Sequence, residues 1–225
     1  MTGDLRQLVE GLLLVIAALL PIVNPFGGAP VFLAMTADCT GALRATLAQK
    51  IAINAFVLLL ASLFVGTYVL EFFGLSVPIV QVAGGIVVCA LGWDLLRQET
   101  TAPGPAPLAG PGEPDIATRA FYPLTLPLTV GPGTISVAIT LGANHARSMR
   151  SLLANGASEL VGVTLIAVTI LVCYRYADRM LHALGATGTS VLVRLSAFIL
   201  LCIGVQILWN GASGLLESLP LARTH

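Results

Sequence analysis

Long stretches of this sequence contain no charged residue. Asp, Glu, Lys and Arg are all absent from residues 11–37, 51–70, 72–93 and 120–146. Two further apolar stretches, 151–174 and 180–216, contain a single charge each, Glu159 and Arg194. Because a helix of roughly 20 apolar residues crosses the hydrocarbon core of a bilayer, these six stretches predict an all-α integral membrane protein with six transmembrane helices.

The composition agrees with a bilayer as the solvent of this chain. Only 10% of the residues are charged and 56% are hydrophobic, whereas a soluble domain carries about 25% charged residues. The formal net charge of +0 at pH 7 gives no basic surface that would favour nucleic acid as a partner. The 4 cysteines form no CxxC pair and there are only 3 histidines, so we expect neither a metal site nor a cofactor.

Two of the six predicted spans contain clusters of helix-breaking residues. The first cluster is PIVNPFGGAP at residues 21–30, and the second is PLTLPLTVGPG at residues 123–133. A proline inside a helix removes one amide donor and clashes with the preceding turn. In hydrocarbon, a broken backbone persists only where it is buried in protein or lines a polar cavity. We therefore expect both helices to be broken at a functional site; a proline kink packed against neighbouring helices is the alternative.

The two clusters divide the chain into similar halves. Each cluster is followed by two plain spans, which gives a first three-helix repeat at 1–97, a linker rich in Pro and Gly at 98–118, and a second repeat at 119–225. With three spans in each half, the repeats would be inverted about an axis in the membrane plane, and the first helix of each would be broken. Paired discontinuous helices of this kind mark the midplane site of many transporters. Gly84 and Gly85 are expected to allow close helix packing.

The distribution of basic residues predicts an orientation. Lys and Arg are more numerous in the loops after the first, third and fifth spans than on the opposite side, which places both termini outside. The residues on the richer side are Arg44, Lys50, Arg97, Arg119, Arg175 and Arg179.

Main-chain groups exposed at the breaks predict a site for a small zwitterion. Carbonyls that end one half-helix suit Na⁺ or an ammonium group, and amides that begin the next suit a carboxylate. Asn24 offers a donor and an acceptor together; its alternative role is to cap the second half-helix. The predicted substrate-binding residues are Asn24, Pro25, Gly27, Gly28, Gly131, Pro132, Gly133, Thr134 and Ser136.

Glu159 is the candidate for ion coupling. An ionisable residue inside a membrane span is commonly functional, and this carboxyl group could carry a coupling proton. A structural hydrogen bond to Asn155 or to a neighbouring hydroxyl is the alternative. The coupling ion, if one is used, is expected to be Na⁺ or H⁺.

Both break sequences are similar to motifs of a known family. The stretch IVNPFGGAPVF, followed by LAMT, and the later stretch PLTVGPGTI resemble the MarC family of bacterial inner-membrane proteins, which includes SnatA-type small neutral amino acid transporters. The resemblance covers residues 8–217 and implies six spans in two inverted halves, distantly similar to the LysE-type exporter superfamily. Gly28 departs from the pattern, since relatives often carry Asn there. The resemblance also implies a multi-pass protein of the bacterial inner membrane.

Transport is the function that these features favour. The sequence predicts a secondary transporter, for uptake or efflux, of small polar solutes, with small neutral amino acids as the leading candidates. Its partners would be the lipid bilayer, the solute and a second copy of the chain in a homo-oligomer. A non-transporting regulatory or assembly subunit is the alternative. An intramembrane enzyme is less favoured, because the spans contain no GxSG serine motif with a spaced histidine and no HExxH motif.

Overall fold

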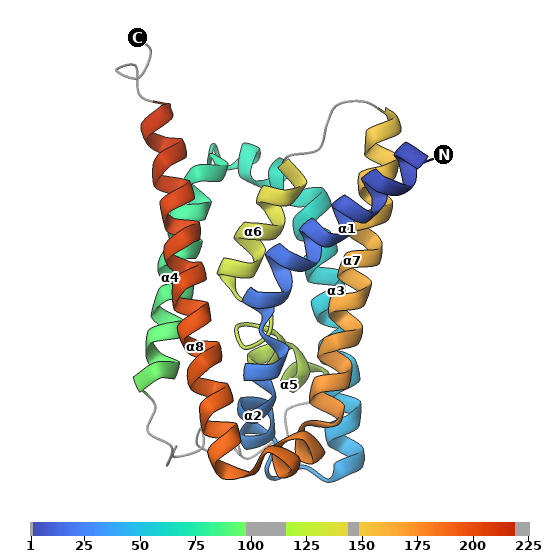
Figure 1. The fold of residues 1–225 in the computed structure, drawn as a ribbon, viewed down its shortest axis with the longest axis vertical. Coiled ribbons are helices and arrows are strands. Elements are labelled where there is room, and N and C mark those ends of the chain that lie inside the picture. The colour runs from blue at the N-terminus through green and yellow to red at the C-terminus, as the bar shows by residue number, and fades with distance from the viewer. Residues whose placement is uncertain (1, 98–115, 144–148, 219–225) are drawn as a thin grey trace.

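The computed structural model describes residues 2–97, 116–143 and 149–218, and within these ranges it contains helices and turns but no strand. The helices form one bundle, in which α1 begins and α8 ends at the same end, the top of Figure 1. In chain order they are α1 (Thr2–Val23), α2 (Pro25–Met35), α3 (Gly41–Phe72), α4 (Val77–Arg97), α5 (Ile116–Arg119), the π-helical η1 (Ala120–Thr125), α6 (Pro132–Ala143), α7 (Met149–Arg175) and α8 (Ala177–Glu217).

Five helical segments of the described chain are long and apolar enough to cross a bilayer, one fewer than the six spans predicted. They are Leu8–Met35, Gly41–Phe72, Val77–Arg97, Gly156–Arg175 and Thr187–Glu217. The difference arises at the second break, where short segments replace the predicted fourth span: α5, η1, a turn at 126–131 and the shorter apolar helix α6. Pro123, Pro127 and Pro132 have no amide hydrogen to donate, so a regular helix cannot continue through this stretch. Most of the predicted linker, 98–115, lies outside the described residues.

α4 and α8 are neighbouring helices that meet at main-chain distance. A Cβ atom on Gly85 of α4 would lie 2.6 Å from the amide nitrogen of Leu208. In the other direction, a Cβ atom on Gly204 of α8 would lie 2.7 Å from the amide nitrogen of Cys89. Gly84 allows α4 to approach α6 closely in the same way. The expectation that Gly84 and Gly85 allow close helix packing is therefore confirmed.

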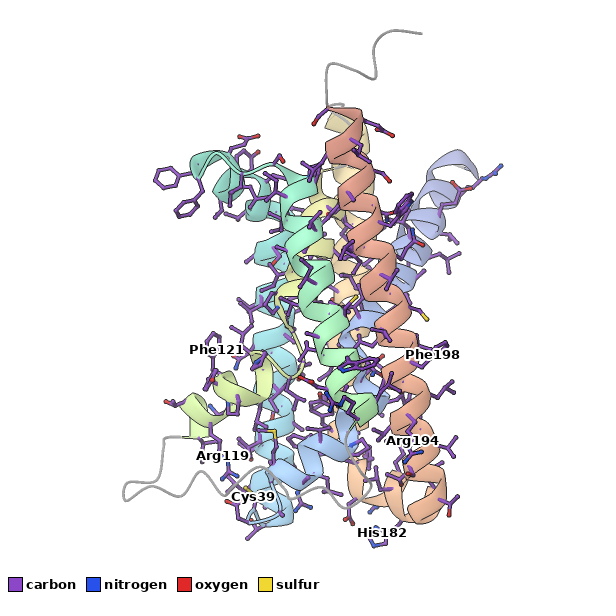
Figure 2. All side chains as sticks on the ribbon, turned by 90° about the vertical axis from the view of Figure 1, so that its left-hand side faces the viewer. Cys39, Arg119, Phe121, His182, Arg194 and Phe198 are labelled. Atoms are coloured by element: carbon purple, nitrogen blue, oxygen red, sulfur yellow. The ribbon has the colours of Figure 1, made fainter. Side chains whose placement is uncertain are left out.

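A second group of helices surrounds the two breaks. α3 and α7 pack on each other, α1 packs on α7, and α6 packs on both α3 and α4. The side chains of Leu19, Leu59 and Ile170 are completely buried in the core between them. On the outside the chain is apolar as well: Phe121 and Phe198 point away from the bundle in Figure 2 and are 44% and 56% exposed. An apolar exterior of this kind suits contact with lipid.

Candidate functional site

The first break consists of one residue, Asn24. It has φ 45° and ψ 57°, the left-handed conformation, which Asn adopts more readily than most other residues that carry a side chain. Its Oδ1 atom accepts a hydrogen bond from the amide of Gly27 at 3.1 Å, and its carbonyl accepts one from the amide of Gly28 at 2.9 Å. The capping role of Asn24 is therefore confirmed. The two glycine amides, which we expected to be free, are both bonded to Asn24.

Two polar groups at the first break have no partner among the described residues. Pro25 has no amide hydrogen, so the carbonyl of Pro21 lacks the donor that a regular helix would supply four residues later. The Nδ2 atom of Asn24 donates to no described residue. A Cβ atom on Gly27 would lie 2.8 Å from Cβ of Ser196, so this break lies against α8. The first break thus presents one acceptor and one donor.

The second break ends where α6 begins. The carbonyl of Gly131 accepts a hydrogen bond from the amide of Ile135 at 3.1 Å. The amides of Gly133 and Thr134, in the first turn of α6, have no acceptor in the part of the chain that the structure describes. Because the N-terminal end of a helix carries a partial positive charge, this turn suits an anionic group such as a carboxylate. Thr134 is buried, whereas the neighbouring Pro132 is exposed.

Gly133 and Ser136 also hold α6 against α4. A Cβ atom on Gly133 would collide with the side chain of Val88. The hydroxyl of Ser136 donates to the carbonyl of Val80 at 2.9 Å. Both residues therefore have a packing role, and their direct contact with a substrate stays a prediction.

Tyr174, at the end of α7, connects the two breaks. Its side chain is completely buried, and its ring stacks on Phe32 of α2 with the ring centroids 4.7 Å apart and the planes 10° apart. The Tyr174 hydroxyl lies 3.0 Å from Oγ1 of Thr129 in the second break. A Cβ atom on Gly28 would lie 2.6 Å from the same hydroxyl. Sequence reasoning did not identify Tyr174; the available signal was a hydroxyl-bearing aromatic in an apolar span, because a buried tyrosine usually needs a polar partner.

The lengths of α2 and α6 fit breaks about half-way through the thickness of a bilayer. α2 has 11 residues and α6 has 12, so at 1.5 Å per residue they are about 16 and 18 Å long. Each length is about half of the ~30 Å hydrocarbon core. From the middle of the bundle α2 runs towards the lower end and α6 towards the upper end (Figure 1), so the N-terminal ends of both half-helices lie in the middle.

Comparison with known proteins identifies the family of this chain. The family model described as MarC family integral membrane protein matches residues 9–216. The chain belongs to the MarC family. The inner membrane protein MarC of Salmonella paratyphi A is 26% identical in an alignment of 221 residues that covers 95% of this chain and 99% of the relative.

Two further relatives extend this result. The membrane protein YvbG of Bacillus subtilis is 28% identical over 202 residues, 89% of this chain and 93% of the relative. MarC of Escherichia coli O157:H7 is 29% identical over 202 residues, 87% and 91% of the two chains. No solved structure matches. The resemblance to the MarC family is confirmed, and so is the prediction of a multi-pass protein of the inner membrane.

In this MarC-family protein, Glu159 lies away from the first break. Glu159 is 6% exposed on α7. Its neighbour Ser158 faces α1, where a Cβ atom on Gly11 would lie 2.6 Å from the Ser158 hydroxyl. Asn24 follows Gly11 by 13 residues, or about 20 Å along the helix. The structure therefore does not bring Glu159 to Asn24. The side chain of Asn155, its alternative partner, lies outside the described residues, and the coupling role stays a prediction.

An ion pair joins the outer ends of the two broken segments. Arg119 of α5 donates to both carboxylate oxygens of Asp38, at 2.7 and 2.8 Å, and to the carbonyl of Met35 at the end of α2, at 2.9 Å. The Arg119 guanidinium lowers the pKa of Asp38 from its ordinary value of 3.8 to about 2. Figure 2 shows Arg119 near Cys39 at the lower end of the bundle. In this chain the ion pair thus joins the end of the first broken segment to the start of the second.

Proposed function

We propose that this MarC-family protein is a secondary transporter of small polar solutes, with small neutral amino acids as its substrates. The observation that carries the proposal is the set of main-chain groups without a described partner in the middle of the bundle: the carbonyl of Pro21 and the amides of Gly133 and Thr134. Unsatisfied backbone groups are costly in hydrocarbon, so a chain that keeps them there needs a polar occupant.

A zwitterion has the charges that these groups require. The Pro21 carbonyl is an acceptor for an ammonium group, and the first turn of α6 is a donor site for a carboxylate. The Nδ2 atom of Asn24 adds a second donor near the first break. α1 packs against α6, which keeps the acceptor and the donors in one region of the bundle. The glycines at both breaks allow a small solute to approach the main chain closely.

The pattern of helix contacts supports two inverted repeats as the basis of alternating access. In the proposed repeats α1 corresponds to η1, α2 to α6, α3 to α7 and α4 to α8. The contact of α1 with α7 then corresponds to that of η1 with α3, and the contact of α2 with α8 corresponds to that of α6 with α4. Two further contacts, α3 with α7 and α4 with α8, each join a helix to its counterpart in the other repeat. In folds built from such repeats, one group of helices can move against the other around a central site.

Tyr174 has a role in this mechanism. Its hydroxyl lies between Gly28 and Thr129, so it occupies the space between the two breaks. We infer that a bound solute replaces the hydrogen bond between Tyr174 and Thr129, which would separate α7 from the second break. Coupling to Na⁺ or H⁺ belongs to the proposal too, with Glu159 as the proton carrier at a distance from the first break.

Counterflow of labelled glycine or alanine in proteoliposomes tests the transport proposal. Na⁺ and pH gradients are imposed separately to identify the coupling ion. Asn24→Ala is expected to abolish flux, whereas Asn210→Ala, the same substitution at an exposed position of α8, is expected to retain it. Full flux in Asn24→Ala would remove Asn24 from the site. Absence of flux of any solute in a wide panel with the wild-type protein would instead favour the regulatory subunit.

A further inference from the structure

A basic cleft of about 400 Å³ lies where α7 ends and where α3 and α8 begin. Three arginines line it: Arg44 from α3, Arg175 from the last turn of α7 and Arg179 from the start of α8. Asp178 is the one carboxylate in the lining. The lining therefore carries three positive charges and one negative charge, a net charge of +2.

Two of these arginines lie at the unfavourable end of a helix. Arg44 is the fourth residue of α3, and Arg179 is the third residue of α8. The N-terminal end of a helix carries a partial positive charge, which disfavours a cation and favours an anion. The first turn of α3 has no acidic residue that would offset this charge. The N-terminus of α3 and two arginines thus favour an anion, whereas Asp178 in the first turn of α8 offsets part of the positive charge at the second N-terminus.

The charge of the cleft is not balanced by the described part of the chain. Within it, no ion pair involves Arg44, Arg175 or Arg179. The nearby carboxylate of Asp38 is already bound by Arg119. The carboxylate of Asp178 lies 3.7 Å from Nδ1 of His182, and both side chains are exposed.

Two of the three arginines contact other residues of the chain. Nη2 of Arg44 donates to the carbonyls of Thr36 and Cys39, at 3.0 and 3.3 Å. Its Nε atom is buried and has no hydrogen-bond partner within the described chain. The guanidinium of Arg179 lies over the ring of Tyr176, 5.6 Å from the ring centroid. The planar fork of a guanidinium is suited to binding phosphate oxygens.

The cleft lies at the level where the membrane spans end. The span of α3 begins beside the cleft and the span of α7 ends beside it, whereas the span of α8 begins only at Thr187. Between them, Gly185 has φ 67°, and the first turns of α8 run across the lower end of the bundle (Figure 1). His182, in these turns, lies at the bottom of Figure 2. Tyr176 is 45% exposed there, as is typical of an aromatic residue at headgroup level.

We propose that this cleft binds a phosphate group at the membrane surface. The phosphate can belong to the headgroup of an anionic phospholipid or to a soluble phosphate. The site is separate from the helix breaks, and it does not depend on the transport proposal.

Binding measurements on the full-length protein in an uncharged detergent test this site and identify the source of the phosphate. The probes are dihexanoyl phosphatidylglycerol, dihexanoyl phosphatidylcholine and inorganic phosphate, and the readout is the Kd from ligand-dependent thermal stability. The wild-type protein is expected to bind phosphatidylglycerol more tightly than phosphatidylcholine. Comparable binding of inorganic phosphate would identify the phosphate group alone as sufficient, whereas binding of phosphatidylglycerol alone would identify a lipid site.

Charge-removing variants locate the binding. Arg179→Gln is expected to raise the Kd at least about tenfold, because a hydrogen bond to a charged group is lost. Arg44→Gln should raise the Kd as well, but it also breaks the hydrogen bonds to Thr36 and Cys39. If Arg44→Gln misfolds, the exposed Arg179 still allows the test. Arg97→Gln, which removes an exposed charge from the end of α4, should leave the Kd unchanged. The proposal is overturned if no anionic probe binds, or if Arg97→Gln weakens binding as much as Arg179→Gln.

Discussion

The hydroxyl of Tyr174 lies 3.0 Å from the hydroxyl of Thr129 and joins α7 to the second helix break. The Thr129 hydroxyl already donates its hydrogen to the carbonyl of Leu124, at 2.8 Å. Tyr174 is therefore the donor to Thr129. Because both side chains are at most 1% exposed, neither hydroxyl can turn to water when the other is removed.

A double-mutant cycle should measure this bond. Tyr174→Phe removes the donor and is expected to lower the free energy of unfolding by about 1 kcal/mol. Thr129→Val leaves the buried Tyr174 hydroxyl without an acceptor and is expected to cost about 1–3 kcal/mol. The double variant should cost less than the sum of the two, which unfolding titrations of the purified protein would detect. Strictly additive costs would show that the two hydroxyls do not interact.

Gly28→Ala should destabilise the contact between α2 and α7. The added methyl group would lie 2.6 Å from the Tyr174 hydroxyl, and the ring cannot move aside easily because it is buried against Phe32. We expect a loss of about 1–3 kcal/mol in the free energy of unfolding. Tyr174→Phe in the same chain should recover part of the loss. Gly41→Ala is the matched control, since a Cβ atom there meets nothing within 4 Å.

The ion pair between Asp38 and Arg119 predicts a pH dependence of stability. Folding lowers the pKa of Asp38 from 3.8 to about 2, so the folded state favours the ionised carboxylate. Its contribution is complete above about pH 4, decreases as the pH falls towards 2, and is absent below. For a pair with an exposed carboxylate we expect about 0.2–1 kcal/mol. The difference in Tm between wild type and Asp38→Asn, measured from pH 7 to pH 2, should follow this course.

Arg119→Gln supplies the complementary measurement for this pair. It should remove the same pH-dependent contribution, and the double variant with Asp38→Asn should lose nothing further. A pH-dependent difference that persists in the Arg119→Gln background would assign the effect to another group.

Gly85→Ala should separate α4 from α8. A methyl group there would lie 2.6 Å from the amide nitrogen of Leu208, and a main-chain atom can move only with its whole helix. We expect a loss of about 1–3 kcal/mol in the free energy of unfolding. Gly156→Ala in α7 is the control, because its nearest neighbour would be 4.0 Å away and alanine has the higher helix propensity. Equal effects of the two substitutions would contradict close packing at Gly85.

Local features of the sequence were enough to predict the membrane class and the helix breaks. The absence of charges between Glu10 and Asp38 predicts a membrane span, and the prolines at 123–132 interrupt a helix within one or two turns. Hydropathy could not show, however, how much of the broken fourth span would stay helical. In the described chain it consists of α5, η1, a turn and the shorter apolar helix α6, so five segments rather than six are long enough to cross a bilayer.

Contacts between distant residues could not be predicted in this way. Thr129 and Tyr174 are 45 residues apart in the sequence, and no periodicity places them together. The capping role of Asn24 was recognisable as an alternative, since Asn is a common N-cap. Once Asn24 is the N-cap, both of its bonds follow, because an N-cap side chain accepts from the amide two or three residues into the helix and its carbonyl accepts the first intrahelical bond. The left-handed conformation of Asn24 was not predicted.

The glycine contacts between α4 and α8 limit how this molecule can move. Where two helices touch through their main chains, there are no side chains between them that could change rotamer and absorb sliding. α4 and α8 are therefore expected to move together as one rigid unit. A rearrangement could open the middle of the protein first to one side of the membrane and then to the other. It would have to occur at helix interfaces that are filled by side chains, such as the stacked rings of Phe32 and Tyr174.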